Sequence, residues 1–462
     1  MKNKLNGNNK LKREIGLFSA TILVIANMVG TGIFTTSGFI MAELGSPGIM
    51  LLCWLCGGLF ALCGALCYGE MGSRFPRAGG EYVFLRESFG RPMAFLSGWI
   101  SLVVGFSAPI AAAAIAFATY GFRTFGAAVD GGWRIAMGGV NVLVISPVTV
   151  TAVAVILAFS LVHYHSLTTG SRVQNALTLF KVVFIVVFIG AGFWFGKGSM
   201  DHFFQTVPME NSLAERFAVS LIFISFAFSG WNAAAYLGGE IKAPQRNIPL
   251  SLFIGTALVI GLYLLLNGVY IYALPVSAMS GVLEVGAVSA TALFGDSISR
   301  LFIGAVALGI LSVLSAMIMS GPRVYYAMAV DDAFFDCFGR VNSKHKTPAA
   351  AIFLQAGIAM LMVITTSFNA LLVYIGFTLA LFAMLTVAGL MKIRRTHPPQ
   401  KSGYQTFGYP LTPLLFILGN AWIIVFSIKS RPLASLFGLA TIGIGVPAYR
   451  YFIGHRGRRH SC

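Results

Sequence analysis

Long apolar runs separated by short polar segments recur along the chain from residue 17 to residue 453. A helix that crosses the hydrocarbon core of a bilayer needs about 20 mostly apolar residues. Twelve runs are long enough, and each is predicted to form a membrane-spanning helix: residues 17–40, 48–71, 93–120, 141–163, 173–196, 215–239, 250–273, 298–329, 348–366, 368–391, 411–428 and 433–453. The pattern predicts one continuous all-α membrane domain, with no soluble domain beside it.

The composition supports this prediction. Of the 462 residues, 57% are hydrophobic and 10% are charged, whereas a soluble domain carries about a quarter charged residues. The formal net charge of +17 raises the possibility of nucleic-acid binding. However, the basic residues lie in short blocks between the apolar runs and not along one face, so we expect no nucleic-acid partner.

The basic residues predict how the chain is oriented, because cytoplasmic loops carry an excess of Lys and Arg. With the N-terminus inside, 24 of the 32 basic residues fall in cytoplasmic segments, 7 fall outside and Lys181 lies within a span. Residues 1–16 and 454–462 are then cytoplasmic tails of a multi-pass protein of the cell (cytoplasmic) membrane. The first apolar run is too long for a cleaved signal sequence and is predicted to be retained.

Two spans carry interruptions at matching positions. The first span contains Gly30-Thr31-Gly32 and the sixth contains Phe228-Ser229-Gly230-Trp231. Glycine weakens a helix by roughly 1 kcal/mol relative to alanine, although small residues also serve close helix packing in membranes. The first and sixth spans are corresponding members of two five-helix halves, residues 17–196 and 215–391, which residues 411–453 follow. This pairing indicates a secondary transporter built from inverted repeats.

Broken helices leave backbone N–H and carbonyl groups free at mid-membrane depth, which is tolerated only where they line a cavity. The N-terminus of a half-helix favours a carboxylate, and freed carbonyls favour an ammonium group. An amino acid presents both groups. The interruptions therefore predict a substrate site for amino acids.

Five motifs in order along the chain carry a family resemblance: Gly30–Phe34 (GTGIF), Tyr68–Met71 (YGEM), Pro76–Tyr82 (PRAGGEY), Gly239–Pro249 (GEIKAPQRNIP) and Arg323–Ala329 (RVYYAMA). Together they resemble the amino acid–polyamine–organocation superfamily. The nearest members look like bacterial L-type amino-acid exchangers and proton-coupled amino-acid permeases. The resemblance implies twelve transmembrane helices in a five-plus-five inverted repeat of the LeuT type, with discontinuous helices 1 and 6.

The resemblance also implies roles for the residues at the two interruptions. Thr31 and Gly32 would bind the substrate carboxylate through their N–H groups, and carbonyls near Met28, Phe228 and Ser229 would bind its ammonium. Phe226 matches the family's gating aromatic, although Trp231 could line the site instead. The predicted substrate site comprises Met28, Gly30, Thr31, Gly32, Phe226, Phe228, Ser229, Gly230, Trp231 and Asn232.

Asn232 bears on the charge of the substrate. Several cation-handling relatives carry an acidic residue at this position, whereas an amide offers no charge to balance a cationic side chain. We therefore expect a neutral amino acid. The alternative is a cationic amino-acid or polyamine antiporter in which another helix supplies the acid.

Lys181 lies nine residues beyond Arg172 on the fifth span, hence about 13 Å deeper along a helix. A charged side chain at that depth is costly and suggests a function. The resemblance implies that the lysine occupies the place that sodium takes in sodium-coupled relatives. It would bridge the broken first helix and the eighth, where Ser312 or Ser315 is the candidate partner. Transport is then expected to be independent of sodium.

Three glutamates, Glu70, Glu81 and Glu240, lie near cytoplasmic ends beside Arg74, Arg77 and Lys242. They could form salt bridges that close the cytoplasmic side, or they could be ordinary interfacial charges. Four cysteines of the second span (Cys53, Cys56, Cys63 and Cys67) fall on one helix face but extend over about 21 Å. That length is too great for one zinc site, so we expect a packing face, no metal and no cofactor.

Other function classes fit the sequence less well. A channel would not need paired broken helices, and neither clustered catalytic residues nor a phosphate-binding loop indicates an enzyme or an ATP-driven pump. A transporter-like amino-acid sensor would have the same site and stays open, as does the choice between exchange and proton symport. The loop between residues 120 and 140 has no cysteine, and we expect no disulfide-linked accessory subunit of the kind that animal L-type relatives use.

Overall fold

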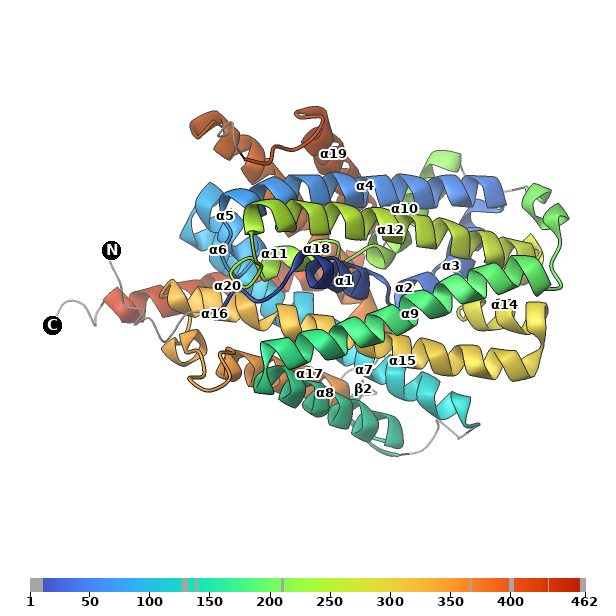
Figure 1. Ribbon diagram of the computed structural model, residues 1–462, viewed down its shortest axis with the longest axis horizontal. Helices are drawn as coiled ribbons and strands as arrows, with labels where there is room; N and C mark the ends of the chain where they lie inside the picture. Colours follow the sequence, from blue (N-terminus) through green and yellow to red (C-terminus); the bar gives the residue numbers. More distant parts are fainter. Residues whose placement is uncertain are drawn as a thin grey trace.

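A computed structural model of the chain describes residues 11–126, 132–137, 140–208, 212–365, 368–398, 403–430 and 432–457. The protein is a bundle of helices, most of which run along a common direction (Figure 1). The long helices are α4 (Pro47–Arg74), α7 (Ala108–Thr124), α8 (Pro147–His165), α9 (Leu167–Phe195), α10 (Leu213–Ala227), α12 (Pro244–Ala273), α15 (Asp296–Ser320), α17 (Ala349–Thr365), α18 (Phe368–Thr396), α19 (Leu411–Ser430) and α20 (Pro432–Gly457).

Shorter helices complete or connect these elements. They are α1 (Leu17–Met28), α2 (Thr31–Thr35), α3 (Ser37–Leu44), α5 (Glu81–Phe89), α6 (Arg91–Ile100), α11 (Ala233–Tyr236), α13 (Val276–Met279), α14 (Val285–Phe294) and α16 (Pro322–Val330), with single 3-10 turns at Met200–Phe204 and Asp336–Gly339. Between α6 and α7 the helix continues as a π-helical segment, Ser101–Ser107.

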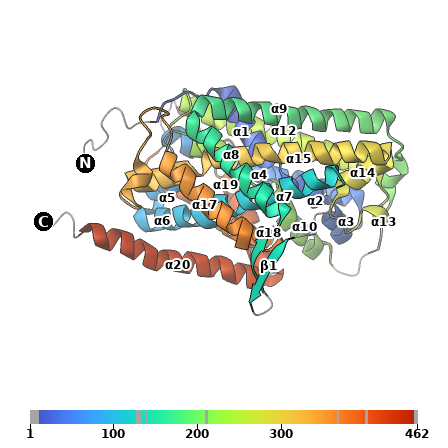
Figure 2. The same ribbon diagram turned by 90° about the horizontal axis from the view of Figure 1, so that it is seen from below.

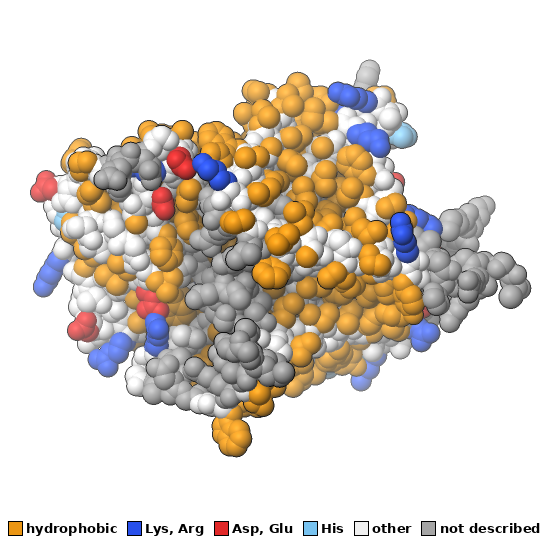
Figure 3. All heavy atoms as spheres, turned by 180° about the vertical axis from the view of Figure 1, so that it is seen from behind, with side chains coloured by type: hydrophobic (Ala, Val, Ile, Leu, Met, Phe, Trp, Pro, Cys, Tyr) orange, Lys and Arg blue, Asp and Glu red, His pale blue; other side chains and the backbone are white. Residues whose placement is uncertain are grey.

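Eight of the described helical stretches are long and apolar enough to cross a membrane. They are Leu17–Thr35, Pro47–Arg74, Arg91–Thr124, Pro147–His165, Leu167–Phe195, Pro244–Ala273, Asp296–Val330 and Leu411–Lys429. Large apolar side chains on their outer faces are exposed, for example Leu52, Val187 and Leu258. Hydrophobic side chains cover the middle of one face of the molecule, and charged side chains lie toward its two ends (Figure 3). The chain is thus a multi-pass membrane protein.

A helix lies at each of the twelve predicted ranges, but one boundary was wrong. Residues 141–163 were expected to be helical throughout, whereas β2 (Val140–Ile145) pairs antiparallel with β1 (Trp133–Met137). The helix α8 starts only at Pro147, where the Ser146 side chain accepts a hydrogen bond from the Thr149 N–H. This cap and the proline at the first helical position favour that start. The apolar hairpin β1–β2 was not predicted, because its pattern merges with that of α8.

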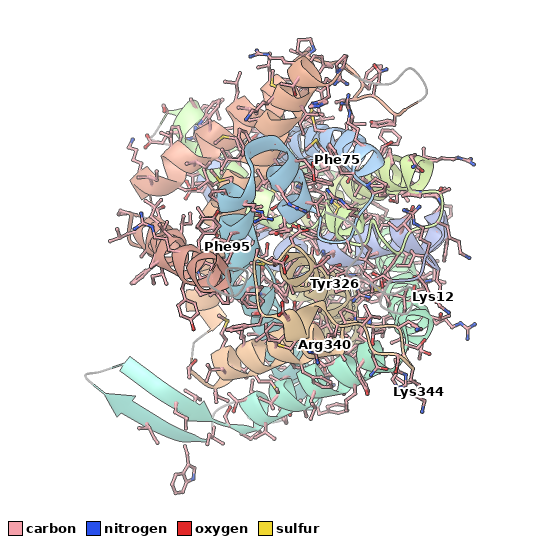
Figure 4. The ribbon with its side chains drawn as sticks, turned by 90° about the vertical axis from the view of Figure 1, so that its left-hand side faces the viewer. Lys12, Phe75, Phe95, Tyr326, Arg340 and Lys344 are labelled. Carbon is pink, nitrogen blue, oxygen red and sulfur yellow. The ribbon has the colours of Figure 1, made fainter. Side chains whose placement is uncertain are left out.

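The two ends of the bundle carry different elements. In Figure 1, α5, α16 and the C-terminal part of α20 lie at one end, and α3 and α14 lie at the other. Figure 2 adds α13 to the second end and places α20 along one side of the bundle. Lys12, Arg340 and Lys344 lie on the end that carries α16 (Figure 4). This end, defined by α5 and α16, is called the basic end below.

Candidate functional site

The two interruptions predicted in the sequence lie against each other in the structure. The chain leaves helical geometry between α1 and α2, and again between α10 and α11. Gly230 has φ of +95°, and a Cβ added to it would lie 2.8 Å from the Asn27 carbonyl oxygen. A Cβ added to Gly32 would lie 2.7 Å from the Cα of Ala227. Only glycine allows both close approaches, and at Gly230 the backbone conformation also requires it.

A cavity of about 180 Å³ lies at the two breaks, with room for on the order of ten water molecules. Every residue of the predicted substrate site lines it: Met28, Gly30, Thr31, Gly32, Phe226, Phe228, Ser229, Gly230, Trp231 and Asn232. Further walls come from α4, α7, α15, α18 and α19. The structure therefore brings together residues that lie 200 positions apart in the sequence.

Free backbone groups of both polarities face this cavity. The N–H groups of Thr31 and Gly32 open α2, and among the described residues no partner is found for either. The carbonyls of Phe228 and Ser229 likewise accept no hydrogen bond within the described chain. Donors at a helix start attract an anionic group, and carbonyls attract an ammonium group. This is the arrangement that the sequence predicted for a zwitterion.

The Met28 carbonyl differs from that prediction. It accepts a hydrogen bond from the Tyr263 hydroxyl at 2.8 Å and one from the Gly30 N–H at 2.9 Å. The same hydroxyl lies 3.0 Å from the Ala227 carbonyl oxygen. Tyr263 of α12 therefore ties the end of α1 to the end of α10. The Met28 carbonyl is occupied by the protein itself.

Asn27 was not predicted as a residue of the site. It lines the cavity beside Met28, and its side-chain oxygen is buried with no hydrogen-bond partner among the described residues. A buried acceptor without a partner costs about 1–3 kcal/mol. A bound ammonium group would supply the missing donor.

The aromatic residues of the cavity differ in how firmly they are packed. Phe228 is buried and contacts the rings of Trp54 and Tyr263, at 5.8 and 5.0 Å between centroids. Trp231 packs edge-on against Tyr68 at 4.7 Å. Phe226 lines the cavity and is only half-buried, and the described rings include none stacked on it. Of the three, Phe226 is the side chain best placed to move.

The π-helical segment Ser101–Ser107 forms part of the cavity wall through Ser101, Gly105 and Phe106. Pro109 explains the local change of geometry, because it has no N–H group to donate to the carbonyl four residues earlier. Such segments within helices are often found at functional sites. The π-helical segment was not predicted, although Pro109 is a sequence signal for it.

Lys181 is buried on α9, 2% exposed, and its ammonium reaches the C-terminal end of α1. It donates to the carbonyl oxygens of Ala26, at 3.1 Å, and Val29. A cation at a helix C-terminus is stabilised by the helix dipole and by the carbonyls that lack partners there. The predicted bridge to the first helix is thus in place.

The predicted partners of Lys181 on the eighth span are bonded elsewhere. Ser315 shares a hydrogen bond with His163 at 2.8 Å, and the Ser312 hydroxyl donates to the Gly309 carbonyl at 2.8 Å. On α15 the lysine lies against Gly309, which has no side chain. A Cβ added to Gly309 would lie 3.2 Å from the Lys181 Cδ. The glycine leaves room for the stem of the lysine.

At the basic end, the segment before α1 is joined to the segment after α11. Ile15 forms a parallel bridge with Ile241, and Ala78 forms an antiparallel bridge with Leu237. The Gly79 N–H donates to the Tyr236 carbonyl at 3.0 Å. These bonds at the basic end are called the inner seal below.

A buried ion pair reinforces the inner seal. Arg323 of α16 forms two hydrogen bonds of 2.8 Å with the Glu240 carboxylate, and both side chains are buried. The sequence left open whether Glu240 forms a salt bridge or is an interfacial charge; its partner in the structure is not the neighbouring Lys242 but Arg323, 83 positions further along the chain. Such a pairing depends on the tertiary structure and not on the neighbouring sequence.

The other two glutamates differ in whether they pair with the neighbouring arginine. Glu70 pairs with Arg74, at 2.7 Å, and also with Arg394 of α18. Arg77 pairs with Glu87 and not with Glu81. A surface arginine on the turn before α5 reaches an outward-facing carboxylate more easily than a buried one.

Glu81 instead faces the cavity and lines its wall near the inner seal. Its Oε1 accepts hydrogen bonds from the Tyr68 hydroxyl at 2.7 Å and from the Asn232 Nδ2 at 2.9 Å. The Tyr236 hydroxyl also bonds to this carboxyl group. Glu81 begins α5, between the spans that end at Arg74 and start at Arg91. Burial raises the pKa of this carboxyl group to about 7, against the lowering effect of its three hydrogen bonds.

The cysteines of α4 are free thiols, and Cys53 and Cys67 are buried. In the part of the chain that the structure describes, no three His, Cys, Asp or Glu side chains are grouped to hold a metal ion.

The fold and the site define a class: a multi-pass membrane protein with a small-molecule cavity at two helix breaks. The family model for amino acid permeases matches residues 15–446 of this chain. The chain therefore belongs to the amino acid permease family, whose members are transporters and not enzymes.

Named relatives match nearly the whole chain. It is 28% identical over 454 residues to the serine/threonine exchanger SteT of Bacillus subtilis, covering 96% of this chain and 97% of that protein. It is 29% identical to the rabbit (Oryctolagus cuniculus) large neutral amino acids transporter small subunit 2, covering 97% and 81% of the two chains. It is 30% identical to the mouse (Mus musculus) b(0,+)-type amino acid transporter 1, covering 91% and 84%.

Proposed function

We propose that this chain is a secondary transporter that carries amino acids across the cell membrane by alternating access. The observation that carries the proposal is the meeting of two broken helices at one cavity. There, the N–H groups of Thr31 and Gly32 and the carbonyls of Phe228 and Ser229, which have no partner among the described residues, suit the two charged ends of an amino acid. The named relatives, an exchanger and two transporters of amino acids, support it.

The proposed topology has twelve transmembrane helices, with residues 17–196 and 215–391 as inverted repeats and residues 411–453 as two further helices. Both termini are cytoplasmic, because most basic residues fall on that side. The basic end is then the cytoplasmic end. The inner seal closes the cavity toward the cytoplasm. Transport requires that the inner seal opens while the Phe226 side chain covers the substrate on the opposite side.

We expect transport to proceed without sodium. The Lys181 ammonium lies against the Ala26 and Val29 carbonyls, where it supplies a fixed positive charge that would repel a mobile cation. Initial uptake of labelled serine should be equal in sodium and choline buffers at matched pH and osmolarity. A strong requirement for sodium would remove Lys181 from this role.

A neutral substrate is the second expectation. The cavity is mainly apolar, and Asn232 presents an amide where a cationic side chain would need a carboxylate. Labelled serine uptake should be inhibited more strongly by unlabelled serine, alanine or leucine than by lysine or arginine.

One observation favours the alternative of a cationic amino-acid or polyamine antiporter: Glu81 supplies a carboxyl group at the inner end of the cavity. Three neutral donors already bond to that group, which is why we place the neutral substrate first. Stronger inhibition by lysine or arginine than by alanine would reverse this order. We propose no disulfide-linked accessory subunit, since residues 120–140 contain no cysteine.

A further inference from the structure

Glu81 joins two groups of helices beside the inner seal. Its own helix, α5, packs against α6, α16 and α18. Its hydrogen-bond partners belong to the other group: Tyr68 to α4, Asn232 to the break between α10 and α11, and Tyr236 to the end of α11. Those elements pack against α1 and α12. The carboxyl group therefore connects parts of the molecule that must move relative to each other if the inner end opens.

The described groups that bond to Glu81 are all neutral. They are the phenols of Tyr68 and Tyr236 and the amide of Asn232. On its own helix, Arg86 pairs with Asp331 and Glu87 pairs with Arg77. From α16, Arg323 pairs with Glu240, and from α18 the Thr386 hydroxyl bonds to Tyr68. Within the described residues, no cation is found paired with Glu81. A buried carboxylate without a cation binds a proton more readily than one in water.

Opening the inner seal would change this environment. The Gly79 N–H bond is made to Tyr236 itself, and Gly79, Ala78 and Leu237 lie one to three positions from Glu81 or Tyr236. When they part, water reaches the carboxyl group and its ordinary acidity returns. The pKa near 7 of the closed form would then fall toward the usual value of about 4.5. A group that loses proton affinity on opening must release its proton on that side.

We propose that Glu81 is a proton-binding site that is loaded while the inner seal is closed and emptied when it opens, so that amino-acid influx carries a proton. The inference rests on the proposed transport function and decides its mode in favour of proton symport. The proton enters through the water of the cavity, which Glu81 lines, and leaves to the cytoplasm. Trp231 links the substrate cavity to this network, since its ring packs on Tyr68.

The test is uptake of labelled serine by the purified protein in liposomes, with the membrane potential clamped at zero. One arm has equal pH on both sides, and the other is about one pH unit more acidic outside. Coupling to one proton allows up to about tenfold accumulation in the second arm, because one pH unit is a tenfold ratio of protons. For Glu81→Gln, whose side chain cannot release a proton, we expect the ratio between the two arms to fall to one, whatever the absolute rate.

Glu87→Gln is the matched control, because Glu87 lies on the same helix, partly exposed and paired with Arg77. It should keep the gradient-driven accumulation of the wild type. Gradient-driven accumulation that survives in Glu81→Gln, or that is absent from the wild type while serine exchange proceeds, would overturn the inference and leave the transport function standing. A wild-type protein that transports no amino acid in either arm would contradict both the proton coupling and the proposed transport function.

A measurement on the unmodified protein covers the case in which Glu81→Gln does not fold. Hydrogen exchange of the amides of Gly79 and its neighbours, corrected for the intrinsic effect of pH, reports opening of the inner seal. Because the closed form holds the proton more tightly, opening should become more frequent as pH rises from about 4.5 to about 7 and should level off above that. Protection that does not change across that range would contradict the proposal.

Discussion

Replacing Lys181 by alanine is expected to abolish amino-acid uptake while the protein still inserts and folds. The Lys181 ammonium is the bond between α9 and the carbonyl end of α1, next to the cavity. Without it the Ala26 and Val29 carbonyls lose their donor, at about 1–3 kcal/mol for each group left unsatisfied. The end of α1, which places Asn27 and Met28 at the wall of the cavity, would no longer be held in place.

The effect on folding should be smaller than the effect on transport. Removing a charge from mid-membrane relieves an insertion cost of about 2.5–3.5 kcal/mol, which offsets much of the loss of the two hydrogen bonds. Expression and thermal stability in detergent measure the first effect, and uptake per molecule of inserted protein measures the second. Lys197→Ala, at an exposed lysine just beyond the same helix, is the control and should behave as the wild type. Normal uptake by well-expressed Lys181→Ala would exclude the lysine from the transport cycle.

Replacing Gly230 by alanine should have the second largest effect, on both transport and stability. At φ of +95° a side chain is strained by about 1–3 kcal/mol. The added Cβ would also lie 2.8 Å from the Asn27 carbonyl oxygen, which real Cβ atoms do not approach. The two broken helices would be forced apart, so the donors of α2 and the carbonyls of Phe228 and Ser229 would no longer face one substrate.

Gly261→Ala provides the matched comparison, because Gly261 lies within α12 with nothing near its Cβ position. Alanine there should leave uptake unchanged and raise stability by up to about 1 kcal/mol. Thermal denaturation and serine uptake of the two variants, side by side, measure both effects. Equal behaviour of the two alanine variants would mean that the close contact at Gly230 is not needed.

The sequence predicted the helices and the two breaks because both depend on local pattern. Apolar length gives the spans, and glycine at mid-span marks the breaks. The ten predicted site residues, named from the breaks and from the resemblance, all line one cavity in the structure. The depth of Lys181 could be counted along one helix. Its contact with the first helix then followed from the resemblance.

Contacts between distant segments could not be read in the same way. The sequence named Lys242 as the basic neighbour of Glu240, yet the partner of Glu240 is Arg323 of α16. It named Arg77 as the basic neighbour of Glu81, but Glu81 follows the turn at Gly79 and Gly80 and bonds to Tyr68 and Asn232. The hairpin before α8 was missed because its apolar residues continue the pattern of the helix. In each case the sequence gives the residue, and packing selects its partner.

The central claim is that the cavity moves an amino acid across the membrane, and counterflow tests it most directly. Purified protein is placed in liposomes loaded with unlabelled serine and diluted into buffer with labelled serine. We predict transient accumulation of label inside, absent from protein-free liposomes and from liposomes that hold the Gly230→Ala variant. Saturable binding of serine without accumulation of label would contradict the account and identify the chain as an amino-acid sensor.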